Sequence, residues 1–174
     1  MTALFDAALL EEAAKKSALL WIAPAGHPAR AVWHVWHDGA VHILTARDAD
    51  GLEQYVPGLA DAATADVTVR SKDKGGRLIA CAAAVTVLTP DAEAWPAAAA
   101  ALHAERLNAP DGEAQPERWA RDCVIVRLDA PHTIAYGEAL PPGPHRAAPV
   151  PTPAKTRGAL PKNFSLGKRR LRGR

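Results

Sequence analysis

An Asp-Gly pair at positions 38–39, between two runs of strand-forming residues, constrains the fold of this 174-residue chain more than any other feature. The runs are 31–37, AVWHVWH, and 40–46, AVHILTA. Asp-Gly supplies the positive φ angles of a two-residue type I′ turn, so the pattern predicts a tight β-hairpin. Such a loop fixes the register. The predicted pairs are His37–Ala40, Trp36–Val41, His34–Ile43 and Val32–Thr45.

Both faces of this hairpin carry large apolar or aromatic groups. Trp36 and Ile43 share one face, and Trp33 and Leu44 share the other. That pattern is typical of a barrel wall with one face in the core and the other under a helix, a ligand or a second subunit. A small barrel buries only one such face in its own core, so we expect a homodimer.

The remaining segments complete an antiparallel arrangement. Helical periodicity predicts helices over 4–16 and 94–107, and strand patterns occupy 17–23, 66–72, 77–89 and 122–128. The β-α-β alternation of a parallel sheet does not occur. The sequence therefore predicts a mainly β domain over residues 1–135, a six-stranded antiparallel β-barrel with flanking helices.

Residues 136–174 differ in composition from the rest of the chain. The part from 139 onward has nine basic residues and no acidic one, whereas 1–138 has 12 basic and 19 acidic residues, a net charge of −7. Seven prolines lie between 141 and 161. Because such a segment buries too little apolar surface to offset its ordering entropy, we predict a disordered basic tail. Any binding of nucleic acid is expected through this tail alone, without sequence specificity, and the acidic domain opposes it.

Segments that direct a chain to a membrane are not recognisable. No apolar run approaches the ~20 residues that span a bilayer. The first residues include Asp6, Glu11 and Glu12, where a secretory signal has a basic start and an apolar core. We expect a cytoplasmic protein with no membrane contact. The two cysteines are too few for a disulfide scaffold or a Cys-rich zinc site.

Common catalytic motifs are missing from the sequence. It contains no Gly-rich phosphate loop, no HExxH and no serine in a nucleophile elbow, which argues against nucleotide hydrolysis and ordinary hydrolase chemistry. Three histidines cluster in the hairpin, but the predicted register puts His34 on one face and His37 and His42 on the other. Because a third ligand is missing, we predict no metal site and name no catalytic side chain.

A basic cluster surrounds the second predicted hairpin. Arg70, Lys72, Lys74 and Arg77 flank the loop 73–76. If Lys72 pairs with Arg77, like charges face each other, which is destabilising unless an anion lies between them. The pattern indicates either a phosphate site or a solvated turn screened by water and salt.

Five stretches carry a resemblance to a known family. They are AVWHVWHDG (31–39), VHILTA (41–46), VTVRSKD (67–73), RLNAPDG (106–112) and RWAR (118–121). Together with the element order, they make residues 17–128 resemble the FMN-binding split-barrel proteins, the superfamily of pyridoxamine 5′-phosphate oxidase. Within it, the chain is similar to an actinobacterial branch that uses FMN or the deazaflavin F420.

The resemblance implies a split barrel that forms a homodimer, with FMN or F420 in a groove and a small-molecule redox substrate. The cofactor-binding residues that it implies are Thr45, Arg47, Arg70, Ser71 and Lys72, with Trp119 or Trp36 near the ring. One stretch departs from the pattern: residues 48–54, DADGLEQ, are acidic where typical pyridoxamine oxidases are basic. This departure argues against a pyridoxal-phosphate substrate site.

Three functions remain open at this point. The first is a flavin-type oxidoreductase of unknown substrate. The second is a non-enzymatic binding protein that keeps the barrel and has lost the redox site. The third is a haem- or tetrapyrrole-binding relative that uses one of the clustered histidines.

Overall fold

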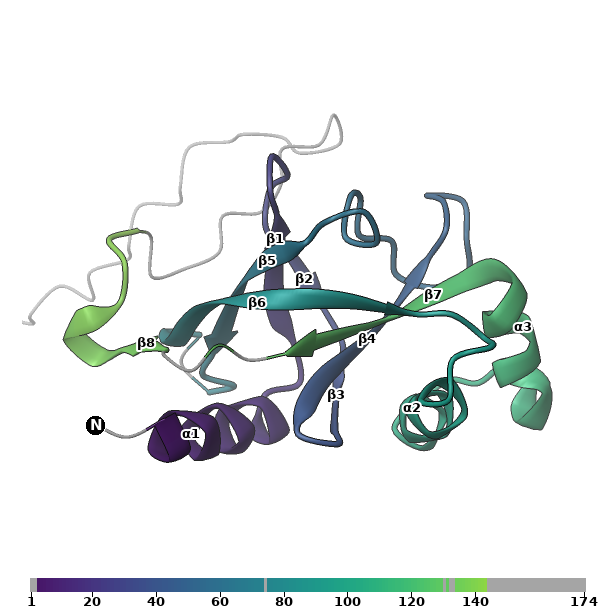
Figure 1. Cartoon of the computed structure of the whole chain (residues 1–174), viewed down its shortest axis with the longest axis horizontal. Helices are drawn as coiled ribbons and strands as arrows, with labels where there is room; N and C mark the ends of the chain where they lie inside the picture. The colour runs from purple at the N-terminus through teal and green to yellow at the C-terminus, as the bar shows by residue number, and fades with distance from the viewer. Residues whose placement is uncertain (1–2, 74, 130, 132–133, 144–174) are drawn as a thin grey trace, which may run out of the picture.

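An antiparallel sheet bent into a half-barrel forms the centre of the molecule (Figure 1). The structure is a computed structural model, and it describes residues 3–73, 75–129, 131 and 134–143. The elements are α1 (Ala3–Lys16), β1 (Leu20–Pro24), β2 (Arg30–Val32), β3 (Val35–His37), β4 (Ala40–Ala46), β5 (Thr64–Arg70), β6 (Arg77–Leu88), α2 (Trp95–Ala104), η1 (Gly112–Ala114), α3 (Gln115–Asp122), β7 (Cys123–Asp129), β8 (Ala135–Tyr136) and η2 (Gly137–Ala139).

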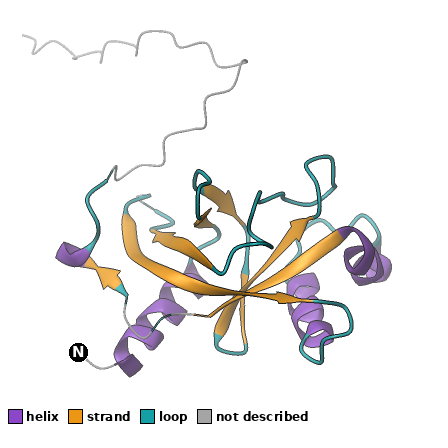
Figure 2. Ribbon diagram, turned by 45° about the horizontal axis from the view of Figure 1, so that its top comes forward, coloured by secondary structure: helices purple, strands orange, loops and turns teal. Residues whose placement is uncertain are grey.

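The strands follow the order β2-β1-β5-β6-β7-β4-β3, with β8 paired to β6, and every pair is antiparallel. Helix α1 lies at one end of the sheet, and α2 and α3 lie at the other (Figures 1 and 2). The predicted mainly β fold, a split barrel with flanking helices, is confirmed. The six predicted strands become eight because the segment 31–37 divides into β2 and β3 and because β8 adds a short strand.

The predicted hairpin turn is present. Asp38 and Gly39 have φ angles of 46° and 69°, both positive as a type I′ turn requires. The pairs His37–Ala40 and Trp36–Val41 have the predicted register. Near the turn, therefore, local sequence determined the structure.

Away from the turn, the predicted pairing is wrong. Val32 pairs with Leu20 of β1 and not with Thr45. Strand β4 pairs with β3 on one side and with β7 on the other. Between β2 and β3, the backbone of Trp33 bonds to a side chain: its N–H donates to Gln54 Oε1 and its C=O accepts from Gln54 Nε2, both at 2.9 Å. This amide replaces the missing strand partner, so the chain can pass from one edge of the sheet to the other.

Two separate cores explain why both hairpin faces are apolar. One core fills the half-barrel and includes Leu20 and Ile43. The second lies under α2 and α3 and includes Leu44, Leu102 and Trp119. Helices of the same chain therefore cover the face for which we had expected a second subunit, and that argument for a dimer is wrong in its premise.

Helix α1 packs through Leu10 and Ala14, whereas Glu11 and Lys15 form an exposed i,i+4 ion pair of 2.5 Å. Within the described residues, no helix is long and apolar enough to cross a membrane. Strand β8 and η2 lie at the predicted domain boundary of residue 135. Most of the predicted basic tail, from residue 144 on, lies outside the described residues, so it stays a prediction.

Candidate ligand-binding pocket

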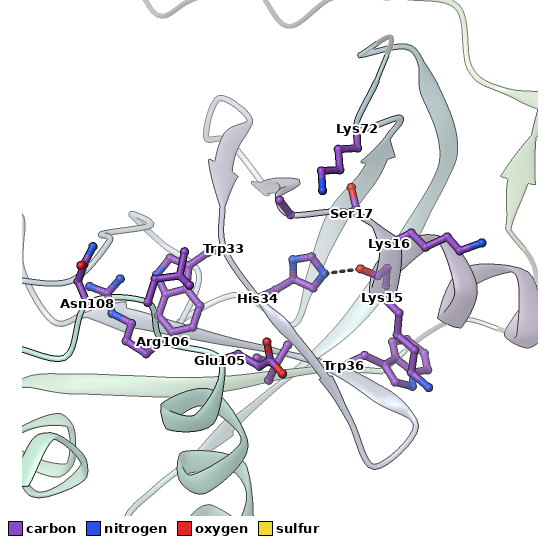
Figure 3. A pocket seen from close by; sticks show the side chains of 14 residues that line it. Lys15, Lys16, Ser17, Trp33, His34, Trp36, Lys72, Glu105, Arg106 and Asn108 are labelled. Atoms are coloured by element: carbon purple, nitrogen blue, oxygen red, sulfur yellow. Dashed lines mark hydrogen bonds between the residues drawn. The ribbon is translucent and has the colours of Figure 1, made fainter. Parts of the chain in front are cut away.

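An open pocket of about 630 Å³ lies between the end of α1, the β2–β3 connection and the residues after α2 (Figure 3). Its size is within the range of small-molecule and cofactor sites. Segments far apart in the sequence build it: 14–18, 33–36, 105–108 and the single residue Lys72. Only the tertiary fold brings these segments together.

Two tryptophan rings line the pocket at separate places, Trp33 beside Arg106 and Trp36 beside Lys15 (Figure 3). Trp33 and Trp36 both line it, and both side chains are half-buried. The Arg106 guanidinium lies over the Trp33 ring, with its central carbon 5.2 Å from the ring centroid. Aromatic rings and a stacked guanidinium are suited to bind another planar ring.

Positive side chains surround these rings. Lys15, Lys16, Lys72 and Arg106 line the pocket, against the one carboxylate of Glu105. Lys15 and Lys16 form ion pairs with glutamates one turn earlier in α1. Lys72 is exposed, and the described residues include no ion-pair partner for it. Of the four cations, Lys72 is therefore the most available to an anionic ligand.

His34 forms part of the same wall (Figure 3). Its Nε2 lies 3.0 Å from the carbonyl oxygen of Ala14. Because a carbonyl oxygen can only accept a hydrogen bond, we assign the proton to Nε2, which leaves Nδ1 as the acceptor. Burial lowers the pKa of His34, and the bond to Ala14 opposes this shift only partly. The ring is accordingly neutral near neutral pH.

A buried carboxylate, that of Glu53, contacts Arg106 in the wall of the pocket. The side chain of Glu53 is 1% exposed. Its Oε1 accepts hydrogen bonds from Arg118 Nη2 at 2.9 Å, Trp119 Nε1 at 3.0 Å and Gln115 Nε2 at 3.3 Å. Its Oε2 lies 2.9 Å from Arg106 Nη2. Arg118 also pairs with Asp111. Sequence reasoning missed this network, and the acidic departure at 48–54 was its only signal.

The structure does not bring the six predicted cofactor-binding residues together. Thr45 is buried, and its hydroxyl accepts from Val56 N at 3.0 Å. Trp119 is 1% exposed in the second core, where its indole N–H donates to Glu53. Arg47 is exposed beside a second pocket of about 500 Å³, and its Nε donates to Arg121 O at 3.0 Å. Of the six, Lys72 lines the 630 Å³ pocket, as does Trp36, the alternative to Trp119.

The predicted like-charge pair exists, but its members are Arg70 and Arg77. Each arginine reaches a carbonyl oxygen: Arg70 Nη1 donates to Gly75 O at 3.0 Å, and Arg77 Nη2 to Pro141 O at 2.6 Å. Arg70 also lies 5.0 Å over the Trp21 ring. Burial and Arg77 lower the pKa of Arg70. These contacts give each guanidinium a hydrogen-bond acceptor within the chain. Lys74 lies outside the described residues, and Ser71 closes the loop through its main chain.

The remaining clustered histidines do not face this pocket. His37 and His42 form an edge-to-face pair with ring centroids 5.6 Å apart. Burial, Arg127 and His37 lower the pKa of His42 to about 4. Within the described part of the chain, no group of three or more His, Cys, Asp or Glu side chains could hold a metal ion.

Comparisons with known proteins find similarity only at the level of structure. No protein-family model matches the sequence, and no curated protein matches it significantly. Several solved structures resemble its fold. One is HutZ, a haem storage protein from Vibrio cholerae, with 12% identity, a TM-score of 0.49, and coverage of 73% of this chain and 91% of that one.

Two further structures come from other bacteria. A putative pyridoxamine 5′-phosphate oxidase from Listeria innocua has 8% identity, a TM-score of 0.49, and coverage of 75% and 96%. An FAD-binding protein from Mesorhizobium loti has 12% identity, a TM-score of 0.47, and coverage of 77% and 90%. The likeness to these structures concerns the fold alone. At these identities, the likeness does not identify a ligand, and the actinobacterial branch stays a prediction.

Proposed function

We propose that this chain binds a flavin-type cofactor, FMN or F420, in the 630 Å³ pocket. One observation carries the proposal: two tryptophan rings and an excess of cations line the same pocket. A planar, anionic ligand needs both features. The tryptophan rings can stack on the planar part of the ligand, and the cations can form charge-assisted hydrogen bonds to its phosphate. The solved structures contribute the fold and nothing more to this argument.

The side chains present fit such a cofactor. Trp33, Trp36 and the stacked guanidinium of Arg106 would contact the ring system. Lys72 would bind the phosphate, as the sequence resemblance implied. Arg70 and Ser71 would act indirectly, by fixing the hairpin from which Lys72 projects.

The reaction that we propose is an oxidation or reduction of a small molecule. The cofactor supplies the hydride chemistry, and the chain supplies binding, orientation and electrostatics. No side chain is assigned as catalytic. A neutral His34 in the pocket wall would hold its proton at Nε2 against Ala14 O, so it would offer no proton to a ligand.

A titration with FMN and F420 tests the proposal. The native chain should bind one of them, and Lys72→Ala should weaken that binding by about tenfold or more, because a hydrogen bond to a charged group contributes roughly 1.5–3 kcal/mol. Arg30→Ala, which removes an exposed charge from β2, is the matched control and should leave affinity unchanged. Equal affinities for Lys72→Ala and the native chain would remove Lys72 from the site.

An absorption spectrum of protein from a host that makes both cofactors separates the alternatives. Flavin bands or the single visible band of F420 would support the proposal. A Soret band would favour haem, for which His34 is the ligand lining this pocket, although its Nε2 is already bonded to Ala14. No band and no binding in the titration would favour the non-enzymatic binding protein.

We also propose that two copies of the chain pair through the outer face of β1, β5 and β6. The register places Trp21, Thr68 and Ala80 in one row across these strands. Ala82 and Ala84 follow on the same face of β6 and are exposed. Asp66, opposite Ala82, also lies on this face, and the side chains around it are small or apolar, which is suited to self-association about a two-fold axis.

A further inference from the structure

Arg106 is held from two sides at the wall of the pocket. One nitrogen of its guanidinium, Nη2, lies 2.9 Å from Glu53 Oε2, and its central carbon lies 5.2 Å from the Trp33 ring centroid. An arginine side chain has many rotamers, and holding it in one conformation costs entropy unless such contacts fix it. Here the carboxylate and the indole ring together fix its position.

Glu53 is itself held rigidly. Three N–H donors, all on α3, reach Oε1, and those of Arg118 and Trp119 lie within 3.0 Å. The next residue, Gln54, bonds to both main-chain groups of Trp33 and to Leu44 O, each at 2.9 Å. Two consecutive residues thus hold Trp33: Gln54 holds its backbone, and Glu53 holds the guanidinium that covers its ring.

The two ends of the pocket differ as a result. At one end lie Trp33 and Arg106, and at the other lie Ser17 and Lys72 (Figure 3). The charge of Arg106 is balanced by the buried carboxylate of Glu53, so this guanidinium offers a flat surface more than a free positive charge. The charge of Lys72 has no such balance among the described residues.

We propose that Glu53 is a positioning residue that acts through Arg106 to orient the ligand, with the planar ring at Trp33 and the anionic end at Lys72. This inference rests on the proposed function, because it concerns the same pocket. It assigns a role to a residue that does not line the pocket.

The test uses probes that separate the two ends. Riboflavin and its deazaflavin counterpart carry a ring without phosphate, and FMN carries both. Glu53→Gln keeps the size of the side chain and removes its charge, so binding of the ring probe and of FMN should weaken by the same factor, about tenfold. Lys72→Ala should weaken FMN binding and leave the ring probe unchanged. Quenching of tryptophan fluorescence by each probe gives the affinities.

Matched variants separate positioning from general damage. Glu117→Gln removes an exposed carboxylate from α3 and should leave every affinity unchanged. Arg106→Gln keeps the three Oε1 contacts of Glu53 and should lower ring affinity as Glu53→Gln does. The double variant Glu53→Gln, Arg106→Gln should bind no more weakly than Arg106→Gln alone, because both changes remove one interaction.

The possible failures are distinguishable. If the native chain binds none of the probes, the proposed function fails and this inference fails with it. If the native chain binds a ring probe and Glu53→Gln binds it equally well, the inference alone is overturned. If the losses of ring affinity in Glu53→Gln and Arg106→Gln add up in the double variant, the claim that Glu53 acts through Arg106 is overturned. If Glu53→Gln does not fold, the comparison of Arg106→Gln with the native chain decides, and unchanged ring affinity refutes the inference.

Discussion

Replacing His42 should change how the stability of this protein depends on pH. His42 lies in the middle of β4, opposite Val35 and Arg127, with 1% of its surface exposed. Its Nδ1 is buried and has no hydrogen-bond partner among the described residues. The groups that face it are the His37 ring and the Arg127 guanidinium, which pairs with Asp38 at 2.9 Å. Burial first, then Arg127 and His37, lower its pKa to about 4.

The sign and size of the effect follow from linkage. The unfolded chain binds a proton at His42 near the ordinary pKa of ~6.5, and the folded chain binds it only near 4. Between these values the unfolded state holds more protons, so stability falls as the pH falls through this window. For one such group, the loss between about pH 7 and pH 5 is roughly 2 kcal/mol.

The assay is urea unfolding of the native chain and of His42→Gln, which has a side chain of similar size that does not titrate. The native chain should lose about 2 kcal/mol more than His42→Gln between about pH 7 and pH 5. Ile43→Val, with His42 intact, serves as the control, and it should cost about 0.5–1.5 kcal/mol equally at both pH values. Equal pH dependence in the native chain and His42→Gln would refute the reasoning.

Three further predictions concern the core, the thiols and the outer face. Trp119→Phe removes one N–H donor from Glu53 and should lower the free energy of unfolding by roughly 1–3 kcal/mol in urea; an unchanged midpoint would contradict this. Burial raises the pKa of Cys81 and of Cys123 to about 11. A thiol reagent near neutral pH should therefore label neither cysteine in the folded protein and both cysteines in urea. Rapid labelling of the folded native chain would be inconsistent with these pKa values. Sedimentation at micromolar concentration should give twice the monomer mass for the native chain and for Ala100→Arg, and the monomer mass for Ala82→Arg; a monomeric native chain would exclude the dimer.

Local sequence determined the elements whose signals are local. Asp38-Gly39 required a type I′ turn, and the two pairs beside it followed. Alternation and helical periodicity located β5, β6, β7 and α1 to within a few residues of the observed bounds. The chemistry of these segments depends on neighbours a few positions away, and a sequence shows such neighbours directly.

The tertiary structure alone decided where the strand 31–37 divides and which residues form the pocket. Gln54 replaces a strand partner of Trp33 from 21 positions away, and Glu53 binds Arg118 from 65 positions away. No spacing rule connects such residues, because only the folded chain brings them into contact. Helix α3, for example, carries Arg118 to Glu53 as it packs on the second core. For the same reason, the charges near Lys72 could be recognised from the sequence as a candidate phosphate site. The position of Trp33 at the other end of the pocket followed only from the tertiary structure.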